Sequence, residues 1–301
     1  MPTSQGAQRD DSSRPAAASA WWGSIDVPRD GVVRLVAGST RVWVERRRFD
    51  WQVYSQSVGA DEPLCVERPT TCASGELPDD AAQMRFCFAD APGRLVVGVA
   101  QADRAIVVRP EAPLSVSPGE RVTLFVSTPT WMVLSVERQR STRRRGTQAA
   151  GETSAVAQKL TELPLERPSD TWFGPSTVEG ELCYALRTPG LLQLEALERS
   201  PHSAITPLTI ENKAADPLLF ERVQVPVPQL AVYVDGRGDL WTNAVQLTRE
   251  TSGDLAAVSI DAGAPKAARG GSERLAAPRL ESGKGSMVRA FSRLLQVGAS
   301  S

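Results

Sequence analysis

The chain has 301 residues, of which 41% are hydrophobic and 23% are charged, and its formal net charge is −1 at pH 7. This length suits one large domain or two ordinary ones, and the near-neutral charge gives no sign of a nucleic-acid-binding surface. Its single histidine, His202, excludes a metal site built from several histidines.

The first half of the chain has the pattern of short strands. Residues 1–20 are polar and aperiodic, which predicts a disordered lead-in. Residues 21–139 form the first predicted β unit. Its expected strands are Gly31–Ala37, Thr40–Glu45, Trp51–Ser55, Arg85–Phe88, Arg94–Val99, Ala105–Arg109, Arg121–Ser127 and Trp131–Val136.

Tryptophans in these segments are candidate core or binding residues. Trp43 alternates with Val42 and Val44, so it points to the opposite face of its strand. We therefore expect an exposed ring there and take Trp43 as a candidate binding residue. Trp131 and Trp172 lie in apolar surroundings and are expected in the core.

The second half resumes the strand pattern after an interruption. The arginine-rich stretch 140–158 is predicted to be a solvated linker, with contact to an anion or acidic partner as the alternative. Residues 159–261 form the second β unit, in which His202 lies in a polar turn and is expected to be solvated. A hairpin turn is expected at 235–239. The expected strands are Glu181–Leu186, Leu191–Leu197, Leu208–Glu211, Leu218–Val225, Leu230–Val234 and Ala244–Thr248.

The C-terminal region changes character twice. Residues 262–285 are rich in Ala, Gly, Pro and Ser and are predicted to be a flexible linker. Residues 286–298 are predicted to form a short amphipathic helix, with Ser286 as its N-cap and Gly298 as its stop. Its apolar side chains share one face through the spacing i, i+1, i+4, i+7 and i+8: Met287, Val288, Phe291, Leu294 and Leu295.

Two short patterns recur along the chain. Trp21-Trp22-Gly23 returns as Trp172-Phe173-Gly174, and Pro113-Leu114-Ser115-Val116 returns as Pro207-Leu208-Thr209-Ile210. This recurrence predicts an internal duplication, and hence an all-β protein of two tandem antiparallel β-sandwich-like units. One merged sandwich is the alternative, and the sequence leaves open whether the two units share a core.

The sequence offers no recognisable catalytic or metal-binding motif. Its cysteines, Cys65, Cys72, Cys87 and Cys183, form no C-x-x-C pair, although Cys65 and Cys72 flank a short loop and could reach each other. The first twenty residues lack the apolar core of a signal peptide, and no apolar run approaches the length of a membrane span. We therefore expect a cytoplasmic protein with reduced thiols, no metal, no other cofactor and no enzymatic activity.

Parts of the second unit resemble a known family. Trp172-Phe173-Gly174-Pro175, Gly180-Glu181-Leu182-Cys183-Tyr184, Ile210-Glu211-Asn212-Lys213 and Val223-Gln224-Val225-Pro226-Val227 are similar to an uncharacterised prokaryotic family described as a domain of unknown function. An arginine commonly lies near the Cys-Tyr position of that family, and Arg187 lies three residues beyond it here. The resemblance covers about 21–250 and implies a loose association with genes for mechanosensitive channels. It assigns no catalytic residues.

These observations favour a non-enzymatic interaction module inside the cell. The tethered helix would bind a protein partner, such as a membrane channel, or contact a membrane surface peripherally. Packing of the helix onto the chain's own β body is the alternative for that segment. The alternative function is a soluble sandwich that binds a carbohydrate-like ligand through Trp43 and the loop Cys65–Asp80. Nucleic acid is not an expected partner, and the oligomeric state stays open.

Overall fold

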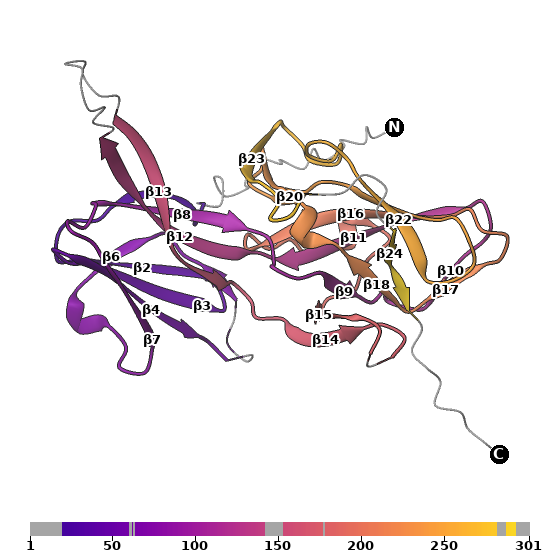
Figure 1. Ribbon diagram of the computed structural model, residues 1–301, viewed down its shortest axis with the longest axis horizontal. Coiled ribbons are helices and arrows are strands. Elements are labelled where there is room, and N and C mark those ends of the chain that lie inside the picture. Colours follow the sequence, from indigo (N-terminus) through magenta and orange to yellow (C-terminus); the bar gives the residue numbers. More distant parts are fainter. Residues whose placement is uncertain are drawn as a thin grey trace, which may run out of the picture.

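The protein consists of two β lobes that lie end to end (Figure 1). The structure is a computed structural model and describes residues 20–59, 62, 64–141, 153–176, 178–281 and 287–292. Within these residues the helical segments are three 3₁₀ turns, η1 (Ser74–Glu76), η2 (Leu194–Ala196) and η3 (Val227–Gln229). The predicted all-β class is therefore confirmed. No helix in this part of the chain is long and apolar enough to cross a membrane.

The first lobe is a sandwich of two antiparallel sheets. One has the order β5-β2-β3-β4-β7, with β6 also paired to β2, and the other has the order β1-β8-β12-β13. The strands of the first sheet are β2 (Gly31–Gly38), β3 (Thr40–Arg46), β4 (Asp50–Ser57), β5 (Cys65–Val66), β6 (Thr70–Cys72) and β7 (Ala82–Cys87). Those of the second are β1 (Gly23–Asp26), β8 (Arg94–Ala100), β12 (Trp131–Ser141) and β13 (Thr153–Pro164).

One apolar core fills the space between these two sheets. Val33, Val42 and Val53 point into it from the first sheet, and Leu95 and Leu134 point into it from the second. The period of two along each strand produces this arrangement, because alternate side chains face the same side. Burial of these aliphatic side chains is the main force that holds the two sheets together.

Trp43 is not the exposed residue that the sequence predicts. The cluster around Val42 and Val44 does not include it, in agreement with the predicted alternation. In register, however, it lies between Arg34 of β2 and Tyr54 of β4, and only 7% of its surface is exposed. The alternation gives the correct face, but neighbouring strands place long side chains beside the ring. Trp131 is buried as predicted, whereas Trp172 is 40% exposed and was wrongly expected in the core.

Cys65 and Cys72 cannot form a disulfide in this fold. They pair with Gly38 and Val32, which lie six positions apart along β2. At 3.3 Å per residue this places them about 20 Å apart, whereas a disulfide needs Cα atoms within about 7 Å. All four cysteines are free thiols.

The second lobe contains a large mixed sheet, a smaller sheet and a two-stranded ribbon. The large sheet has the order β23-β19-β20-β16-β21-β22-β24, with β11 on the other side of β16. Its strands are β11 (Arg121–Pro129), β16 (Ser203–Asn212), β19 (Val232–Asp235), β20 (Leu240–Thr242), β21 (Val245–Arg249), β22 (Leu255–Ile260), β23 (Ser272–Ala276) and β24 (Met287–Arg289). Several predicted strands overlap these, and the hairpin at 235–239 joins β19 to β20 as expected. The expected strand Leu191–Leu197 instead contains η2.

The smaller sheet packs against the large one across a second core. Its order is β14-β15-β9-β18-β25, and β10 pairs with β17 beside it. The strands are β9 (Ile106–Val108), β10 (Leu114–Val116), β14 (Ser169–Phe173), β15 (Glu181–Ala185), β17 (Leu218–Phe220), β18 (Arg222–Val225) and β25 (Phe291–Ser292). Ile106 and Val223 meet Leu124 and Leu208 in this core. The pairs β15–β9, β16–β20 and β16–β21 are parallel, so the lobe is not purely antiparallel.

The two lobes are interleaved along the chain and are not tandem repeats. Strands β9 to β11, placed by the sequence in the first unit, belong to the second lobe, and the chain then returns to the first lobe as the β12–β13 hairpin. The ends of β12 and β13 take up residues 140–141 and 153–158 of the predicted linker 140–158, and residues 142–152 lie outside the described residues. The recurring motifs are not equivalent either. Leu114–Val116 form a peripheral ribbon strand, whereas Leu208–Ile210 lie in the middle of β16.

The predicted C-terminal linker and helix are also corrected. Strand β23 lies within 262–285 and pairs with β19, while Met287, Val288 and Phe291 belong to β24 and β25 instead of a helix. The N–H groups of Ala290 and Phe291 both donate to the Asp254 carbonyl, at 2.9 and 3.2 Å. Such a bulge breaks the period of two along the strand. The apolar residues Met287, Val288 and Phe291 are therefore spaced in sequence as they would be on a helix, although they lie in strands. Leu294 and Leu295 lie outside the described residues, as do residues 1–19 of the predicted lead-in.

Backbone carbonyls tie the lobes together at a junction around His202. The Thr130 N–H and hydroxyl donate to the His202 carbonyl at 3.0 and 2.8 Å, and Trp21 Nε1 donates to the Pro201 carbonyl at 2.9 Å. Beside this junction, within the first lobe, the Ser39 N–H donates to the Leu165 carbonyl at 2.7 Å. His202 is therefore buried, and the prediction of a solvated histidine is wrong.

Apolar and charged contacts strengthen the same junction. Ala204, Val232 and Leu240 of the second lobe pack into the core of the first. Arg279 forms an ion pair with Glu162 of β13, and its Nε donates to the Gln101 carbonyl at 2.6 Å. The lobes therefore have separate main cores but one continuous contact.

Candidate functional site

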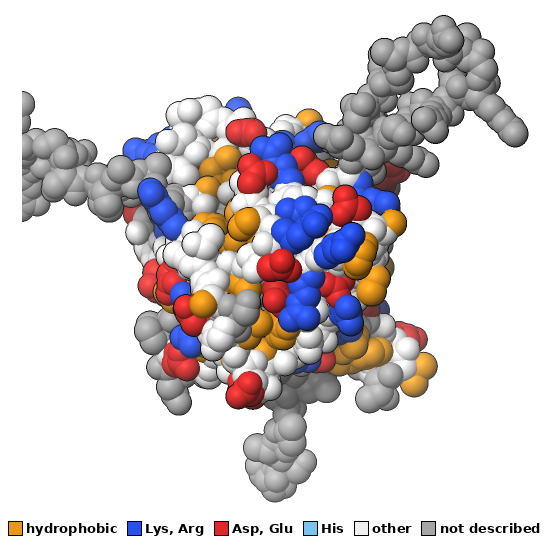
Figure 2. Space-filling model, turned by 90° about the vertical axis from the view of Figure 1, so that its left-hand side faces the viewer, with side chains coloured by type: hydrophobic (Ala, Val, Ile, Leu, Met, Phe, Trp, Pro, Cys, Tyr) orange, Lys and Arg blue, Asp and Glu red, His pale blue; other side chains and the backbone are white. Residues whose placement is uncertain are grey.

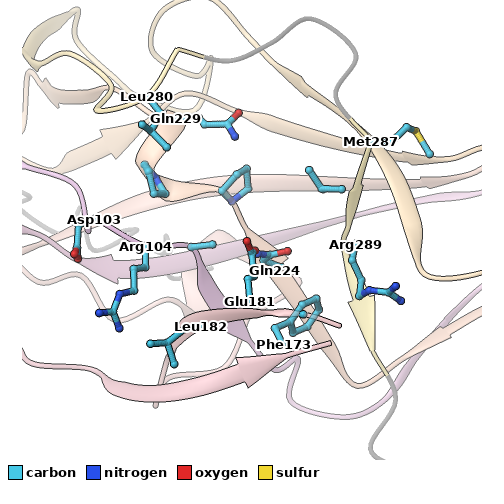
Figure 3. A pocket seen from close by; sticks show the side chains of 15 residues that line it. Asp103, Arg104, Phe173, Glu181, Leu182, Gln224, Gln229, Leu280, Met287 and Arg289 are labelled. Carbon is cyan, nitrogen blue, oxygen red and sulfur yellow. The ribbon is translucent and has the colours of Figure 1, made fainter. Parts of the chain in front are cut away.

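A cavity of about 540 Å³ lies where two neighbouring strands diverge (Figure 3). Val223 of β18 is paired with Phe291 of β25, and the Gln224 N–H donates to the Ala290 carbonyl at 2.9 Å. Continuing this register would set Pro226 opposite Val288. Pro226 has no N–H to donate, and the chain turns away through η3. Because β24 instead follows β22, a gap opens, which we name the β24 cavity.

Exposed apolar side chains surround this cavity. Leu182 of β15, Leu280 and Met287 of β24 are 47%, 56% and 51% exposed, and all three line it. Figure 3 shows them around a centre formed by Phe173, Glu181 and Gln224. Large apolar side chains gathered at a hollow, with polar groups around them, are typical of a binding surface.

The polar groups at the rim are held in fixed positions. Arg104 forms an ion pair with Asp170 at 3.0 Å, and its guanidinium lies 5.2 Å from the centre of the Tyr184 ring. The Tyr184 hydroxyl donates to Asp103 at 2.8 Å. On the opposite side, Arg289 pairs with Asp254 at 2.5 Å. Both arginines are therefore oriented before any ligand arrives.

Two polar side chains at the cavity differ in what they can offer a ligand. The Cys183 thiol is buried beneath it, where Gln224 Nε2 donates to the sulfur at 3.5 Å. Burial, with a smaller contribution from Glu181, raises the pKa of Cys183 to about 12, so the thiol stays protonated at neutral pH and is a poor nucleophile. By contrast, Gln229 Oε1 is buried at the lining without a hydrogen-bond partner. Rotation of this side chain would be needed to present the oxygen to a ligand.

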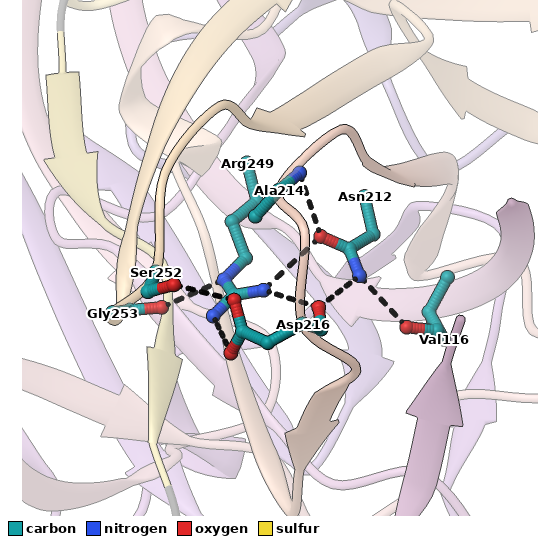
Figure 4. Close-up of polar contacts among 7 residues, drawn as sticks. All are labelled: Val116, Asn212, Ala214, Asp216, Arg249, Ser252 and Gly253. Atoms are coloured by element: carbon teal, nitrogen blue, oxygen red, sulfur yellow. Dashed lines mark hydrogen bonds and ion pairs between the residues drawn. The ribbon is translucent and has the colours of Figure 1, made fainter. Parts of the chain in front are cut away.

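A second cavity, of about 680 Å³, lies on the other side of Arg289 and is built around arginines. Figure 4 shows Arg249 at the centre of a hydrogen-bond network. Its guanidinium donates to Asn212 Oδ1 at 3.1 Å, to the Gly253 carbonyl at 3.0 Å and to Asp216 Oδ2 at 2.8 Å. Hydrogen bonds from Arg249 and then Ser252 lower the pKa of Asp216. We name this cavity, which Arg222 also lines, the Arg222 cavity.

The end of the first lobe carries mixed charge. Figure 2 shows basic and acidic side chains interspersed over this face. Arg34 pairs with Glu67 and Arg41 pairs with Glu62, each at 2.6 Å. A cleft there is likewise lined by paired charges, with Arg94 within 3.6 Å of both Asp26 and Glu137. Exposed pairs of this kind contribute little energy, and they neutralise the basic groups.

The structure separates the residues that the sequence selected. Met287 and Val288 line the β24 cavity, whereas Phe291 is buried in the core against Phe220, with 5.4 Å between ring centres. Trp43 is buried in the other lobe, so the carbohydrate-binding alternative loses its stacking ring. Leu182, Leu280 and Gln229 were missed. The only available signal was the Pro226-Val227-Pro228 stretch, since prolines end a strand's pairing.

Comparison with known proteins gives a family but no characterised relative. Among the described residues, no group of three or more His, Cys, Asp or Glu side chains is placed to hold a metal ion. No curated protein and no solved structure matches the chain. The sequence of residues 21–296, however, matches the model of a family described as "Protein of unknown function (DUF432)". Since this match spans most of the chain, the protein belongs to the DUF432 family.

Proposed function

We propose that this protein is a non-enzymatic interaction module that binds an extended segment of a partner protein in the β24 cavity. The observation that carries the proposal is the gathering of Leu182, Leu280 and Met287, all exposed, around a cavity beside a strand edge. Interfaces place apolar anchor side chains in such hollows and surround them with a polar rim. Arg104 and Arg289 supply that rim here.

The edge of β24 favours an extended partner segment. In the described part of the chain, β24 pairs with β22 on one side, and no strand pairs with its other side. Unpaired strand edges accept an added strand through backbone hydrogen bonds, and alternate side chains of the added strand then enter neighbouring pockets. Gln229 also lines the cavity, and rotation of its side chain would turn the unpartnered Oε1 into a further acceptor for an N–H of that segment.

We propose further that the partner is a membrane protein and that binding takes place in the cytoplasm. The support is the association with mechanosensitive channels that the family resemblance implies. A soluble segment of such a channel is therefore the first partner to test. The tethered-helix version of this proposal is withdrawn, because Met287–Ser292 form strands on the chain's own body.

The test compares two substitutions on the same hairpin. Leu182→Glu places a charge in the β24 cavity, whereas Val178→Glu alters an apolar residue that is 88% exposed and does not line it. Full-length protein with a photo-crosslinker at Met287 is used to capture partners from the membrane fraction of the native host. Binding to the identified segment is then measured by calorimetry.

The expected result is a channel segment that is crosslinked at Met287 and binds wild type and Val178→Glu equally. Leu182→Glu should weaken this binding at least tenfold, which corresponds to about 1.4 kcal/mol, a typical loss at an interface anchor. Equal binding by both variants would exclude the β24 cavity as the site. Capture of the same proteins by a crosslinker at Phe49, in the other lobe, would show that the capture is non-specific.

A further inference from the structure

Arg222 is a partly buried cation without a carboxylate partner. Its Nη2 donates to Ser292 Oγ at 2.8 Å, and its guanidinium lies 5.6 Å from the centre of the Phe173 ring. Its Nε is buried and has no hydrogen-bond partner. The other two arginines of the Arg222 cavity each have an aspartate, whereas no carboxylate in the described part of the chain lies within ion-pair distance of Arg222.

The surroundings make this lack of a partner costly. Burial lowers the pKa of Arg222, and the nearby charge of Arg109 lowers it further, while Glu221 acts weakly in the opposite direction. Removing a charge from water without pairing it is unfavourable, and so is leaving a buried N–H without an acceptor. An anion bound in the cavity would relieve both costs.

We infer that the Arg222 cavity is a binding site for a monoanionic carboxylate, held by the guanidinium of Arg222. The cavity, of about 680 Å³, has room for such a group, and the Arg222 side chain lines it. An arginine matches the planar carboxylate geometrically, since its N–H groups point in parallel at the two oxygens.

Charge matching selects a carboxylate over a phosphate dianion. Arg222, Arg249 and Arg289 line the cavity together with Asp216 and Asp254, which leaves a net charge of one positive unit. A monoanion neutralises this charge. A dianion would leave an excess negative charge beside two aspartates, so inorganic phosphate should bind more weakly than acetate.

This inference does not rest on the proposed function, although Arg289 lines both cavities. The carboxylate could belong to a small metabolite or to an acidic side chain of a protein partner, and both present the same group. Acetate serves as the probe for the first source. A capped Gly-Glu-Gly peptide, compared with its Gly-Gln-Gly counterpart, serves as the probe for the second.

The experiment follows the arginine Nε–H resonances of the full chain by NMR during titration at constant ionic strength. The Arg222 resonance is assigned by its loss in Arg222→Lys, and the resonance of Arg34, which is paired with Glu67, is the internal control. We expect a saturable shift of the Arg222 resonance with acetate, a smaller one with phosphate, and none for Arg34. The Glu peptide should shift it more than acetate if the natural ligand is an acidic side chain.

A second measurement covers the case in which the Lys variant is perturbed. Acetate should raise the melting temperature of the wild-type protein relative to the same concentration of chloride. The dependence of this shift on concentration gives the affinity for acetate, which Arg222→Gln should weaken roughly tenfold or more. Arg34→Gln should behave as wild type. The inference is wrong if acetate moves the Arg222 and Arg34 resonances alike, if it moves neither, or if Arg222→Gln responds to acetate as wild type does.

Discussion

His202 is a single titratable group on which the stability of the lobe junction depends. Burial lowers its pKa to about 4 from an ordinary value of 6.5. Below pH 6.5 the unfolded chain therefore binds a proton that the folded chain does not, and stability falls with decreasing pH until about pH 4. The total loss is about 3 kcal/mol. Urea unfolding at pH 7 and pH 4.5 should show most of this loss, and His202→Gln should flatten the pH dependence; an unchanged dependence in that variant would contradict the assignment.

Arg249 is a buried charged residue of the second lobe whose removal should be strongly destabilising. Its side chain is 4% exposed and donates to Asn212, Asp216 and Gly253. Arg249→Ala removes the hydrogen bonds from this buried side chain to Asn212, Asp216 and Gly253 together with its ion pair, so we expect a loss of about 3 kcal/mol in the free energy of unfolding. Arg249→Lys keeps the positive charge but not the planar set of guanidinium N–H donors. Its loss in the free energy of unfolding should therefore lie between those of wild type and Arg249→Ala. Denaturant unfolding of both variants measures this order, and equal stabilities would contradict it.

The sequence gives residue environments only in part. The face of Trp43 follows from its strand's alternation, but its burial depends on Arg34 and Tyr54, which are supplied by neighbouring strands. His202 lies in a polar turn in sequence, yet this turn is covered because Trp21 and Thr130 are anchored to its carbonyls. Such burial depends on contacts between distant segments, which a local pattern does not contain.

At the scale of elements, the turn between β2 and β3 should be unusually sensitive to a methyl group. Gly38 has φ +62°, and a Cβ there would lie 2.2 Å from the Leu165 carbonyl oxygen. Gly119 has φ +79° and open space around it, so it is the matched control. Gly119→Ala should cost about 1 kcal/mol for the left-handed backbone. Gly38→Ala should cost clearly more, because the junction must also move; equal melting temperatures would show that the clash relaxes freely.

Elements with a regular alternation are predictable, and those that switch sheets are not. β2, β3 and β8 lie within one sandwich, and their periods of two identify them in the sequence. At Ala290 the chain passes from β24 in the large sheet to β25 in the small one. The bulge opposite Asp254 shifts the spacing of the apolar side chains, so that in the sequence they follow the period of a helix. The β24 cavity arises at this same switch, which is why the sequence locates Met287 and Val288 but not its other lining residues.

At the scale of the whole molecule, the interleaving predicts which pieces can fold. Ala100 and Trp131 are paired in register, so a short Asn-Gly turn can join 21–100 directly to 131–165. We expect this piece to unfold cooperatively in urea, with lower stability than the full chain because Ala204, Val232 and Leu240 are missing. The piece 21–139 lacks β13 and should not fold. Cooperative unfolding of 21–139 would contradict the importance of the β12–β13 hairpin.

The topology is the part that the sequence could not supply. Trp131 pairs with both Ala100 and Pro164, and β11 pairs with β16 about 80 residues later. The residues of one strand do not indicate which distant strand it pairs with. Strands predicted in chain order therefore suggest two consecutive units. The recurring tryptophan and proline motifs strengthened this impression, although the fold places their copies in unlike positions.

The return of the chain to the first lobe also has a consequence for its synthesis. Strands β2 to β7 are complete at Cys87, but the hairpin that covers their inner face ends at Pro164. At ordinary elongation rates, roughly 80 further residues take about 4–16 s. For much of that time the nascent chain presents an apolar sheet that only β1 and β8 can cover. We therefore compare chains that end at residue 130 with chains that end at residue 230, both after release from the ribosome. The shorter chains should bind holdase chaperones more strongly and should be cleaved faster by protease.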